Sequence, residues 1–315
     1  MTRKFVYLIG NPVEHSISPH MHNAAFKALG MDEWEYKAIK VEKEDLNSKI
    51  EEFKDLKIEG FNVTVPHKEE VIKLVDVPNK DVDGRENLAK LLGAVNTVRN
   101  NNGKFIGYNT DCEGFFDSLN YDGKFDAKDK KAVVLGAGGA ARAVAGALYY
   151  KGLSEVKIYD VDYSKAKKFV DSLIEAFKVR ILIDQNFKIS VINNDKDLNN
   201  QIQDSSLLVN ATPVGMWPDD DISPIKDENV LHNGLFVYDL VYNPVETKLL
   251  KLARSKGAKG ITGLGMLVRQ GAASFKLFTG HDAPVDVMMK AAQKALGLLR
   301  VLKNTTIPTP TAYIK

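Results

Sequence analysis

The feature that most constrains this chain of 315 residues is an apolar run that leads directly into a glycine-rich turn and then a helical pattern. The run 132–135 reads Ala-Val-Val-Leu, and the turn 136–141 reads Gly-Ala-Gly-Gly-Ala-Ala. A buried strand that ends in G-x-G-x-x-A and opens a helix is typical of the first βα unit of a doubly wound parallel sheet. The sequence therefore predicts an α/β fold with a Rossmann-type dinucleotide-binding domain.

The small residues of this turn have separate tasks. Gly136 permits the tight turn, Gly138 lets the backbone approach a pyrophosphate, and Ala141 lets the helix pack closely on the strand. A strand-to-helix turn without a ligand is the structural alternative. The predicted cofactor-binding residues here are Gly136, Ala137, Gly138, Gly139 and Ala140.

The next strand, 156–159, is followed by Asp160. A carboxylate at this place accepts hydrogen bonds from the adenosine ribose hydroxyls of NAD and repels the ribose phosphate of NADP. No arginine occurs between Asp160 and Lys165. NAD is therefore expected over NADP, although Asp160 also suits a helix N-terminus and Lys165 could weaken the preference.

Strands and helices alternate on both sides of a polar stretch at 120–131, which predicts two α/β lobes. We expect the first domain to cover residues 1–111 and to be completed by helices at 264–303 that return to it. The Rossmann domain is then 112–263, and the Thr/Pro-rich segment 304–315 is expected to be a flexible tail. Expected strands of the first lobe are 5–9, 35–39, 61–65, 94–99 and 104–108, and a helix is expected to start at Pro66. Residues 100–103, Asn-Asn-Asn-Gly, are expected to join the last two strands as a hairpin.

Composition excludes several classes of protein. Lys and Arg total 43 against 41 Asp and Glu, a net charge of +2 that gives no reason to expect a nucleic-acid partner. The N-terminal apolar run is too short for a signal peptide, no membrane span is needed, and the one cysteine, Cys112, fits a reducing compartment. His15, His20 and His22 lack a carboxylate set that would complete a metal geometry, so no metal is expected. A cytoplasmic location is expected.

The first lobe carries motifs that identify a family. In chain order they are 10–20, 62–68, 93–97 and 107–111, and the distal half adds 210–216, 239–244 and 263–270. These segments resemble the signatures of the shikimate dehydrogenase family, and the resemblance spans about residues 5–300. It implies reversible reduction of 3-dehydroshikimate to shikimate by hydride transfer.

Two residues acquire a catalytic role from this resemblance. Lys68 matches the family's catalytic lysine, which handles the hydroxyl proton, and Asp111 matches its partner. A lysine base near neutral pH needs a desolvated setting, and a nearby carboxylate opposes that shift. Without the resemblance, Lys68 reads as a solvated helix residue and Asp111 as a loop carboxylate.

The resemblance also assigns residues that bind the ligands. Ser16 and Ser18 match residues that bind the substrate carboxylate, where hydroxyl donors orient an anion without adding charge. Their alternative role is a helix N-cap. Further matches are Thr64, Asn96 and Gln270 for the ring hydroxyls, Tyr242 for the carboxylate, Asn62 for support of the pocket, and Leu240, Gly263 and Met266 for the nicotinamide.

Each of these residues has a plainer explanation. Thr64 suits a strand, Asn96 a turn, Gln270 a helix surface and Tyr242 a core. Three alternative functions also remain open: a quinate/shikimate dehydrogenase with dual substrate use, a non-catalytic sensor that binds shikimate or quinate, and an enzyme for another ring acid. The expected partner is a small molecule, and a homodimer is left open.

Overall fold

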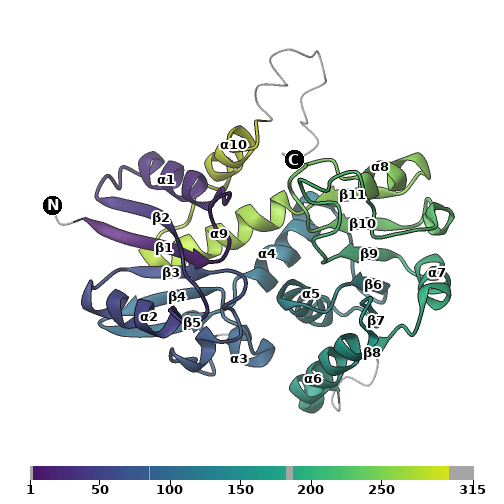
Figure 1. Cartoon of the computed structure of the whole chain (residues 1–315), viewed down its shortest axis with the longest axis horizontal. Helices are drawn as coiled ribbons and strands as arrows, with labels where there is room; N and C mark the ends of the chain where they lie inside the picture. Colours follow the sequence, from purple (N-terminus) through teal and green to yellow (C-terminus); the bar gives the residue numbers. More distant parts are fainter. Residues whose placement is uncertain (1–2, 85, 182–186, 298–315) are drawn as a thin grey trace. The chain divides into compact units, whose positions relative to one another are not determined.

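The computed structural model describes residues 3–84, 86–181 and 187–297 and forms two compact α/β units (Figure 1). The first unit comprises residues 1–114 and the segment from Val268 onward, and the second comprises residues 115–267. Both boundaries fall inside helices, α4 (Asp111–Asp117) and α9 (Leu264–Thr279). The predicted fold class is confirmed, and the return of the last helices to the first unit is part of it. The predicted tail 304–315 lies outside the described residues.

The first unit is built on a five-stranded sheet in the order β2-β1-β3-β4-β5. β1 is parallel to β2 and β3, whereas β4 runs antiparallel to both β3 and β5. The carboxyl ends of β1, β3 and β5 and the amino end of β4 therefore share one edge of the sheet. The strands are β1 (Lys4–Gly10), β2 (Trp34–Lys40), β3 (Gly60–Val63), β4 (Thr97–Asn101) and β5 (Lys104–Tyr108).

Local chemistry fixes the hairpin between β4 and β5. Asn102 and Gly103 form its two-residue loop with φ of 55° and 89°. Asn-Gly tolerates this left-handed backbone, which matches the twist of the flanking strands. The hairpin was expected from the sequence.

Helices cover both faces of this sheet. α1 and α10 lie side by side (Figure 1), and α2 packs Ile50 and Phe53 against Phe61 and Val63 of β3 in one buried cluster. Burial of such side chains stabilises the unit by roughly 1.5–3 kcal/mol each. The helices of this unit besides α4 and α9 are α1 (Ser18–Ala28), α2 (Leu46–Asp55), α3 (Leu88–Leu92) and α10 (Val285–Ala295).

The helix expected from Pro66 is wrong. Residues 66–70 form turns, and only a short 3-10 helix, η1 (Val71–Lys73), follows. Tertiary bonds take the place of the helix: the His67 ring lies 2.8 Å from the Val41 carbonyl oxygen, and the Lys68 carbonyl accepts a bond of 2.8 Å from the Val95 N–H. These bonds hold the turn after β3 against two other segments.

The second unit is a six-stranded parallel sheet in the order β11-β10-β9-β6-β7-β8. The chain moves outward from β6 to β8 and then returns to the other side of β6 as β9, so the topological switch lies between β6 and β9. Among the described residues, no helix is long and apolar enough to cross a membrane. The elements are η2 (Ser118–Asp122), β6 (Lys131–Leu135), α5 (Gly139–Tyr150), β7 (Glu155–Tyr159), α6 (Tyr163–Ile181), β8 (Lys188–Val191), α7 (Asp195–Gln203), β9 (Leu207–Asn210), η3 (Glu228–Val230), β10 (Phe236–Asp239), α8 (Lys248–Ser255) and β11 (Lys259–Thr262).

Candidate functional site

Lys68 and Asp111 form the ion pair at the centre of the first unit's site. Lys68 follows β3 and Asp111 follows β5, so parallel strands deliver both to the same sheet edge. Lys68 Nζ donates a bond of 2.6 Å to Asp111 Oδ2, and the two side chains are 20% and 9% exposed. The structure thus brings together the two predicted catalytic residues, with the lysine the more accessible partner.

Asn96 orients this pair. Its Nδ2 donates a bond of 2.8 Å to Asp111 Oδ1, and its Oδ1 accepts a bond of 2.8 Å from the Thr110 backbone N–H. The backbone donor fixes which end of the amide faces Asp111, because a flipped amide would point an oxygen at the carboxylate. Asn96 is 3% exposed, so its contacts within the protein determine its orientation.

Gln270 joins the same cluster from α9. Its Oε1 lies 3.4 Å from Thr110 Oγ1 and 3.5 Å from Asn96 Nδ2. A Cβ on Gly114 would lie 2.6 Å from the Gln270 Cβ and 2.7 Å from its backbone nitrogen. The glycine in α4 therefore allows α9 to come this close.

The other predicted substrate residues of this unit follow β1 and β3 at the same edge. Ser18 begins α1 and is buried, and its N–H donates a bond of 3.3 Å to Ser16 Oγ. The N-cap of this helix is Ile17 and it has no side-chain cap bond, so neither serine takes the N-cap position of the structural alternative. The Thr64 N–H donates to the Ile9 carbonyl, and a Cβ on Gly10 would lie 2.3 Å from Thr64 Cγ2. Gly10 therefore permits the turn after β3 to approach β1.

Several buried residues of this cluster were not predicted from the sequence. Thr97, Thr110 and Ser274 bring their hydroxyl groups together beside Asn62, whose Oδ1 accepts a bond of 2.8 Å from the Tyr36 hydroxyl. Thr97 and Thr110 lie inside the motif segments 93–97 and 107–111, which was the signal available for them, and Ser274 lies four residues after the motif that ends at Gln270. Ser274 follows Gln270 by one helical turn, so the two share a face of α9.

The second unit supplies the glycine turn at the end of β6. Gly136 has φ of 99°, and a Cβ there would lie 3.1 Å from the Ala211 carbonyl oxygen after β9. Gly138 precedes α5, and a Cβ on it would meet nothing within 4 Å. Ala141 is fully buried. The turn therefore lies at the switch point and leaves open space above the helix N-terminus.

Asp160 is already engaged by neighbouring groups. Its Oδ2 accepts bonds of 3.0 Å from the Ala137 N–H and 2.9 Å from Lys165 Nζ. Burial by itself would raise the pKa of Asp160, but the Lys165 bond and the Asp162 and Ala137 N–H groups hold it below its ordinary value. The acid thus stands in an ion pair at the end of β7.

The loops after β10 and β11 contain the residues predicted to lie near a nicotinamide. A Cβ on Gly263 would lie 2.0 Å from the Leu240 carbonyl oxygen, so only glycine permits this packing. Met266 is buried, and burial raises the pKa of Tyr242. Asp239 anchors the loop through three donors, the Asn210 side chain, the Val241 N–H and the Thr247 hydroxyl.

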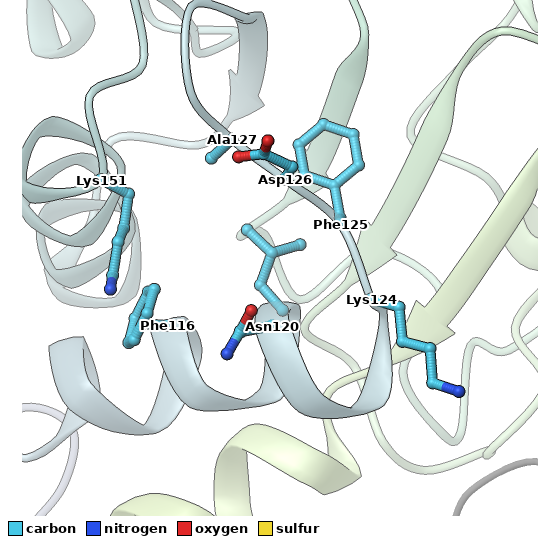
Figure 2. A pocket seen from close by; sticks show the side chains of 8 residues that line it. Phe116, Asn120, Lys124, Phe125, Asp126, Ala127 and Lys151 are labelled. Atoms are coloured by element: carbon cyan, nitrogen blue, oxygen red, sulfur yellow. The ribbon is translucent and has the colours of Figure 1, made fainter. Parts of the chain in front are cut away.

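His22 and a cavity in the second unit belong to none of the predicted sites. Within the described residues, no group of three His, Cys, Asp or Glu side chains is arranged to hold a metal ion. His22 is buried against Tyr36, with ring centroids 4.2 Å apart, and burial lowers its pKa to about 3. A cavity of about 450 Å³ in the second unit (Figure 2) is lined by Phe116, Leu119, Asn120, Lys124, Phe125, Asp126, Ala127 and Lys151.

Together, a lysine–aspartate pair in one unit and a glycine turn at the switch point of the other define a class, the two-unit dinucleotide-dependent oxidoreductases. Residues 8–98 match the shikimate dehydrogenase substrate binding domain, and residues 263–293 match the shikimate 5'-dehydrogenase C-terminal domain. The chain belongs to the shikimate dehydrogenase family.

Individual relatives are similar over most of their length. The shikimate dehydrogenase (NADP(+)) of Methanopyrus kandleri is 45% identical over 292 residues, 92% of this chain and 95% of the relative. A solved shikimate dehydrogenase in complex with NADP+ is 41% identical with a TM-score of 0.81 and covers 94% of this chain and 98% of its own. Shikimate 5-dehydrogenase from Listeria monocytogenes, in complex with shikimate and NAD, is 32% identical with a TM-score of 0.80 over 91% and 96% of the two chains.

The expected preference for NAD over NADP is wrong by this comparison. Relatives that are 40–45% identical to this chain are named shikimate dehydrogenase (NADP(+)), and a solved neighbour is in complex with NADP+. The structure supplies a physical reason, because Asp160 is neutralised in part by Lys165 rather than free to repel a ribose phosphate. Lys165, noted in the sequence as the residue that could weaken the preference, makes this contact.

Proposed function

We propose that the protein is a shikimate dehydrogenase that interconverts shikimate and 3-dehydroshikimate with NADP(H). One observation carries the proposal. In a chain of this family, Lys68 Nζ lies 2.6 Å from Asp111 Oδ2 beside a cluster of buried polar side chains. The pair supplies the proton chemistry that oxidation of a ring hydroxyl requires.

Lys68 performs the proton step in this proposal. During oxidation its Nζ accepts the proton of the substrate hydroxyl, and during reduction it returns that proton. Asp111, fixed by Asn96 at 2.8 Å, holds the lysine in place and is the more buried of the two. Positioning of this kind contributes to rate by keeping the base within reach of the reacting hydroxyl.

The remaining polar residues would recognise the substrate. Ser16 and Ser18 are proposed to bind its carboxylate, and Asn96, Gln270 and Thr64 its ring hydroxyls. Neutral amides and hydroxyls suit a ring that carries several hydroxyl groups. In support, Asn96 Nδ2 and Gln270 Oε1 lie 3.5 Å apart in one cluster. Tyr242 is proposed as a further carboxylate ligand.

The glycine turn fits a dinucleotide. The open space at Gly138 and the N-terminus of the 12-residue α5 provide backbone N–H groups and a positive dipole end for a pyrophosphate. Residues 136–140 would hold that group, and Leu240, Gly263 and Met266 would hold the nicotinamide. The bound cofactor would supply the hydride acceptor and donor.

Lys165 is proposed to favour NADP over NAD. Its side chain is half exposed, and its Nζ lies 2.9 Å from Asp160 Oδ2, at the end of the strand that faces the adenosine ribose in this fold. NADP carries a phosphate on this ribose that NAD lacks, and the Lys165 ammonium group would interact favourably with that phosphate. Lys165→Ala should therefore raise the KM for NADP more than that for NAD, by roughly ten-fold for a lost charged hydrogen bond.

The domain assignment remains a proposal. Residues 1–111 with 264–303 are proposed to bind substrate, and residues 112–263 are proposed to bind the cofactor. The cytoplasm is the proposed compartment, supported by the single cysteine of the sequence, because chains of reducing compartments rarely depend on disulfides.

Steady-state kinetics test the function. Oxidation of shikimate, quinate and aminoshikimate is measured with NADP and with NAD, following the absorbance of the reduced cofactor, for the wild type, Lys68→Ala and Lys73→Ala. Lys73 is a matched control because it forms an exposed pair with Glu70 in the same segment. Shikimate turnover that Lys68→Ala abolishes and Lys73→Ala keeps would support the proposal.

The other outcomes separate the alternatives. Comparable turnover of quinate would establish dual substrate use, and turnover of aminoshikimate alone would make the protein an enzyme for another ring acid. Tight binding of shikimate without turnover of any pair would contradict the proposal and support a sensor.

A further inference from the structure

Ser274 is a fully buried hydroxyl that ties α9 to the sheet of the first unit. It is 0% exposed, and its Oγ lies 3.0 Å from Asn62 Nδ2 on β3 and 2.8 Å from Thr97 Oγ1 on β4. A third partner, Thr110 Oγ1, lies 3.1 Å away in the segment after β5. One side chain therefore joins three segments of the sheet edge to a single turn of α9.

The protons of this cluster can be assigned by what each group is able to donate. Ser274 has one hydroxyl proton. Its Oγ lies 3.0 Å from the backbone carbonyl oxygen of Gln270, which can only accept a hydrogen bond. With its proton given to that carbonyl, Ser274 Oγ accepts from the Asn62 amide and from one of the two threonine hydroxyls. The serine is then fully satisfied, and its oxygen is the acceptor on which the others converge.

Thr97 and Thr110 also contact the side-chain amides of Asn96 and Gln270, which are proposed to bind the substrate. Thr97 Oγ1 donates to Asn96 Oδ1 at 3.1 Å, and Thr110 contacts both Asn96 and the Gln270 Oε1. Gln270 lies one helical turn before Ser274, so anchoring Ser274 sets the position and rotation of the turn that carries Gln270. Removal of the hydroxyl would leave the helix packed but no longer bonded to β3 and to the segment after β5.

We infer that Ser274 is a positioning residue for substrate recognition, which holds Gln270 against Asn96 by bonding α9 to Asn62 and Thr110. The inference rests on the proposed function, because it assumes that Gln270 and Asn96 contact the ring hydroxyls. It assigns Ser274 no part in the proton step, since Lys68 and Asp111 are held by other bonds.

Kinetics of Ser274→Ala test the inference. The KM for shikimate should rise roughly three- to ten-fold, the range expected when one substrate hydrogen bond is misplaced. The KM for NADP should not change, and kcat should stay within about two-fold, because a uniform binding contact is lost. In a Gln270→Ala background, Ser274→Ala should add less than about a two-fold further rise, since both changes remove the same contact.

Ser205→Ala is the matched control. Ser205 is also buried, lies just after α7 and donates to the backbone carbonyl four residues before it, Gln201 in the last turn of that helix, at 2.7 Å. This variant removes the same kind of serine bond to a helix carbonyl and should leave the KM for shikimate unchanged. Equal effects of the two variants, or a full additional effect of Ser274→Ala in the Gln270→Ala background, would overturn the inference.

Hydrogen exchange separates this inference from the proposed function. If the wild type turns over no shikimate, the proposed function fails, and exchange of the backbone amides of 268–276 without substrate decides the positioning role. Faster exchange there in Ser274→Ala than in Ser205→Ala supports the anchor, and equal exchange contradicts it. If Ser274→Ala does not fold, Ser274→Cys, whose thiol is a weak hydrogen-bonding group of similar shape, serves in both measurements.

Discussion

Uncharged side chains position the Lys68–Asp111 ion pair of the first unit. Asn96 fixes the Asp111 carboxylate, and the Thr110 N–H fixes the Asn96 amide, all within a cluster that is less than a tenth exposed at each of these residues. A fully satisfied polar network specifies one arrangement, whereas a partly satisfied network would be costly. Loss of any single member should therefore disturb catalysis before it disturbs the fold.

Asp111→Asn tests this expectation. The variant keeps the shape of the side chain but replaces the ion pair with Lys68 by a neutral contact. We expect kcat for shikimate oxidation to fall by about 10²- to 10⁴-fold, the range for general acid–base groups, with a smaller change in KM. Asp76→Asn is the control, since it removes an exposed aspartate–lysine pair with Lys104; a similar loss in both variants would contradict the assigned role.

Asp239 gives the second unit a pH-dependent stability. It is fully buried, all three of its donors are uncharged groups, and burial raises its pKa to about 6. In the unfolded chain Asp239 has its ordinary pKa of 3.8. Between pH 3.8 and 6 the folded state therefore holds a proton on Asp239 that the unfolded state has released. The contribution of Asp239 to the unfolding free energy is therefore largest below pH 3.8 and is lost as pH rises through 6.

Asp239→Asn removes this dependence. Between pH 5 and pH 7.5 the wild type should lose about 1 kcal/mol more unfolding free energy than the variant. Urea unfolding at the two pH values measures the difference, with the exposed Asp219→Asn as a control. An unchanged pH dependence in Asp239→Asn would show that the carboxyl is not the titrating group.

At the scale of elements, the strand, glycine turn and helix of 131–150 form a unit whose parts have separable tasks. Gly138→Ala meets open space and a φ of −111° that alanine adopts, so stability should change by less than about 1 kcal/mol. The KM for NADP should rise at least about ten-fold, because the methyl group occupies the approach of the pyrophosphate.

Gly263→Ala is the contrasting change. Its methyl would lie 2.0 Å from the Leu240 carbonyl oxygen and 2.5 Å from the carbonyl carbon, so the loop after β10 has to move. We expect a loss of about 1–3 kcal/mol in unfolding free energy, as for other overpacked sites. Denaturant titration of both glycine variants checks the pair; a destabilised Gly138→Ala with a normal NADP KM would contradict the division of tasks.

Elements whose cause is local could be predicted from the sequence. The β6 turn was predicted because it needs only an apolar strand and small residues, and the β4–β5 hairpin because Asn102-Gly103 adopts its turn unaided. The helix at Pro66 was predicted wrongly, since bonds to Val41 and Val95 from distant segments override the local pattern. Ser274 escaped notice because its role depends on three segments that only the fold assembles.

At the scale of the whole molecule, a ligand that binds only the folded chain stabilises it in proportion to its binding. NADP at 100 times its dissociation constant should raise the unfolding free energy of the unit that binds it by about 2.7 kcal/mol. Because the glycine turn lies in residues 115–267, the rise should appear in the transition of that unit where the two units unfold separately, and in the single transition where they unfold together.

Thermal unfolding of the wild type and three variants with and without NADP measures this linkage. The wild type should show the full rise in the midpoint, whereas Lys165→Ala and Gly138→Ala should each show about half of it or less at the same NADP concentration. Ten-fold weaker binding lowers the stabilisation to about 1.4 kcal/mol, and neither variant removes a core contact. Lys68→Ala should retain the full rise, since Lys68 belongs to the first unit and handles a proton rather than the dinucleotide. An NADP-induced rise that Gly138→Ala keeps and Lys68→Ala loses would move the cofactor site to the first unit and reverse the assignment of the two domains.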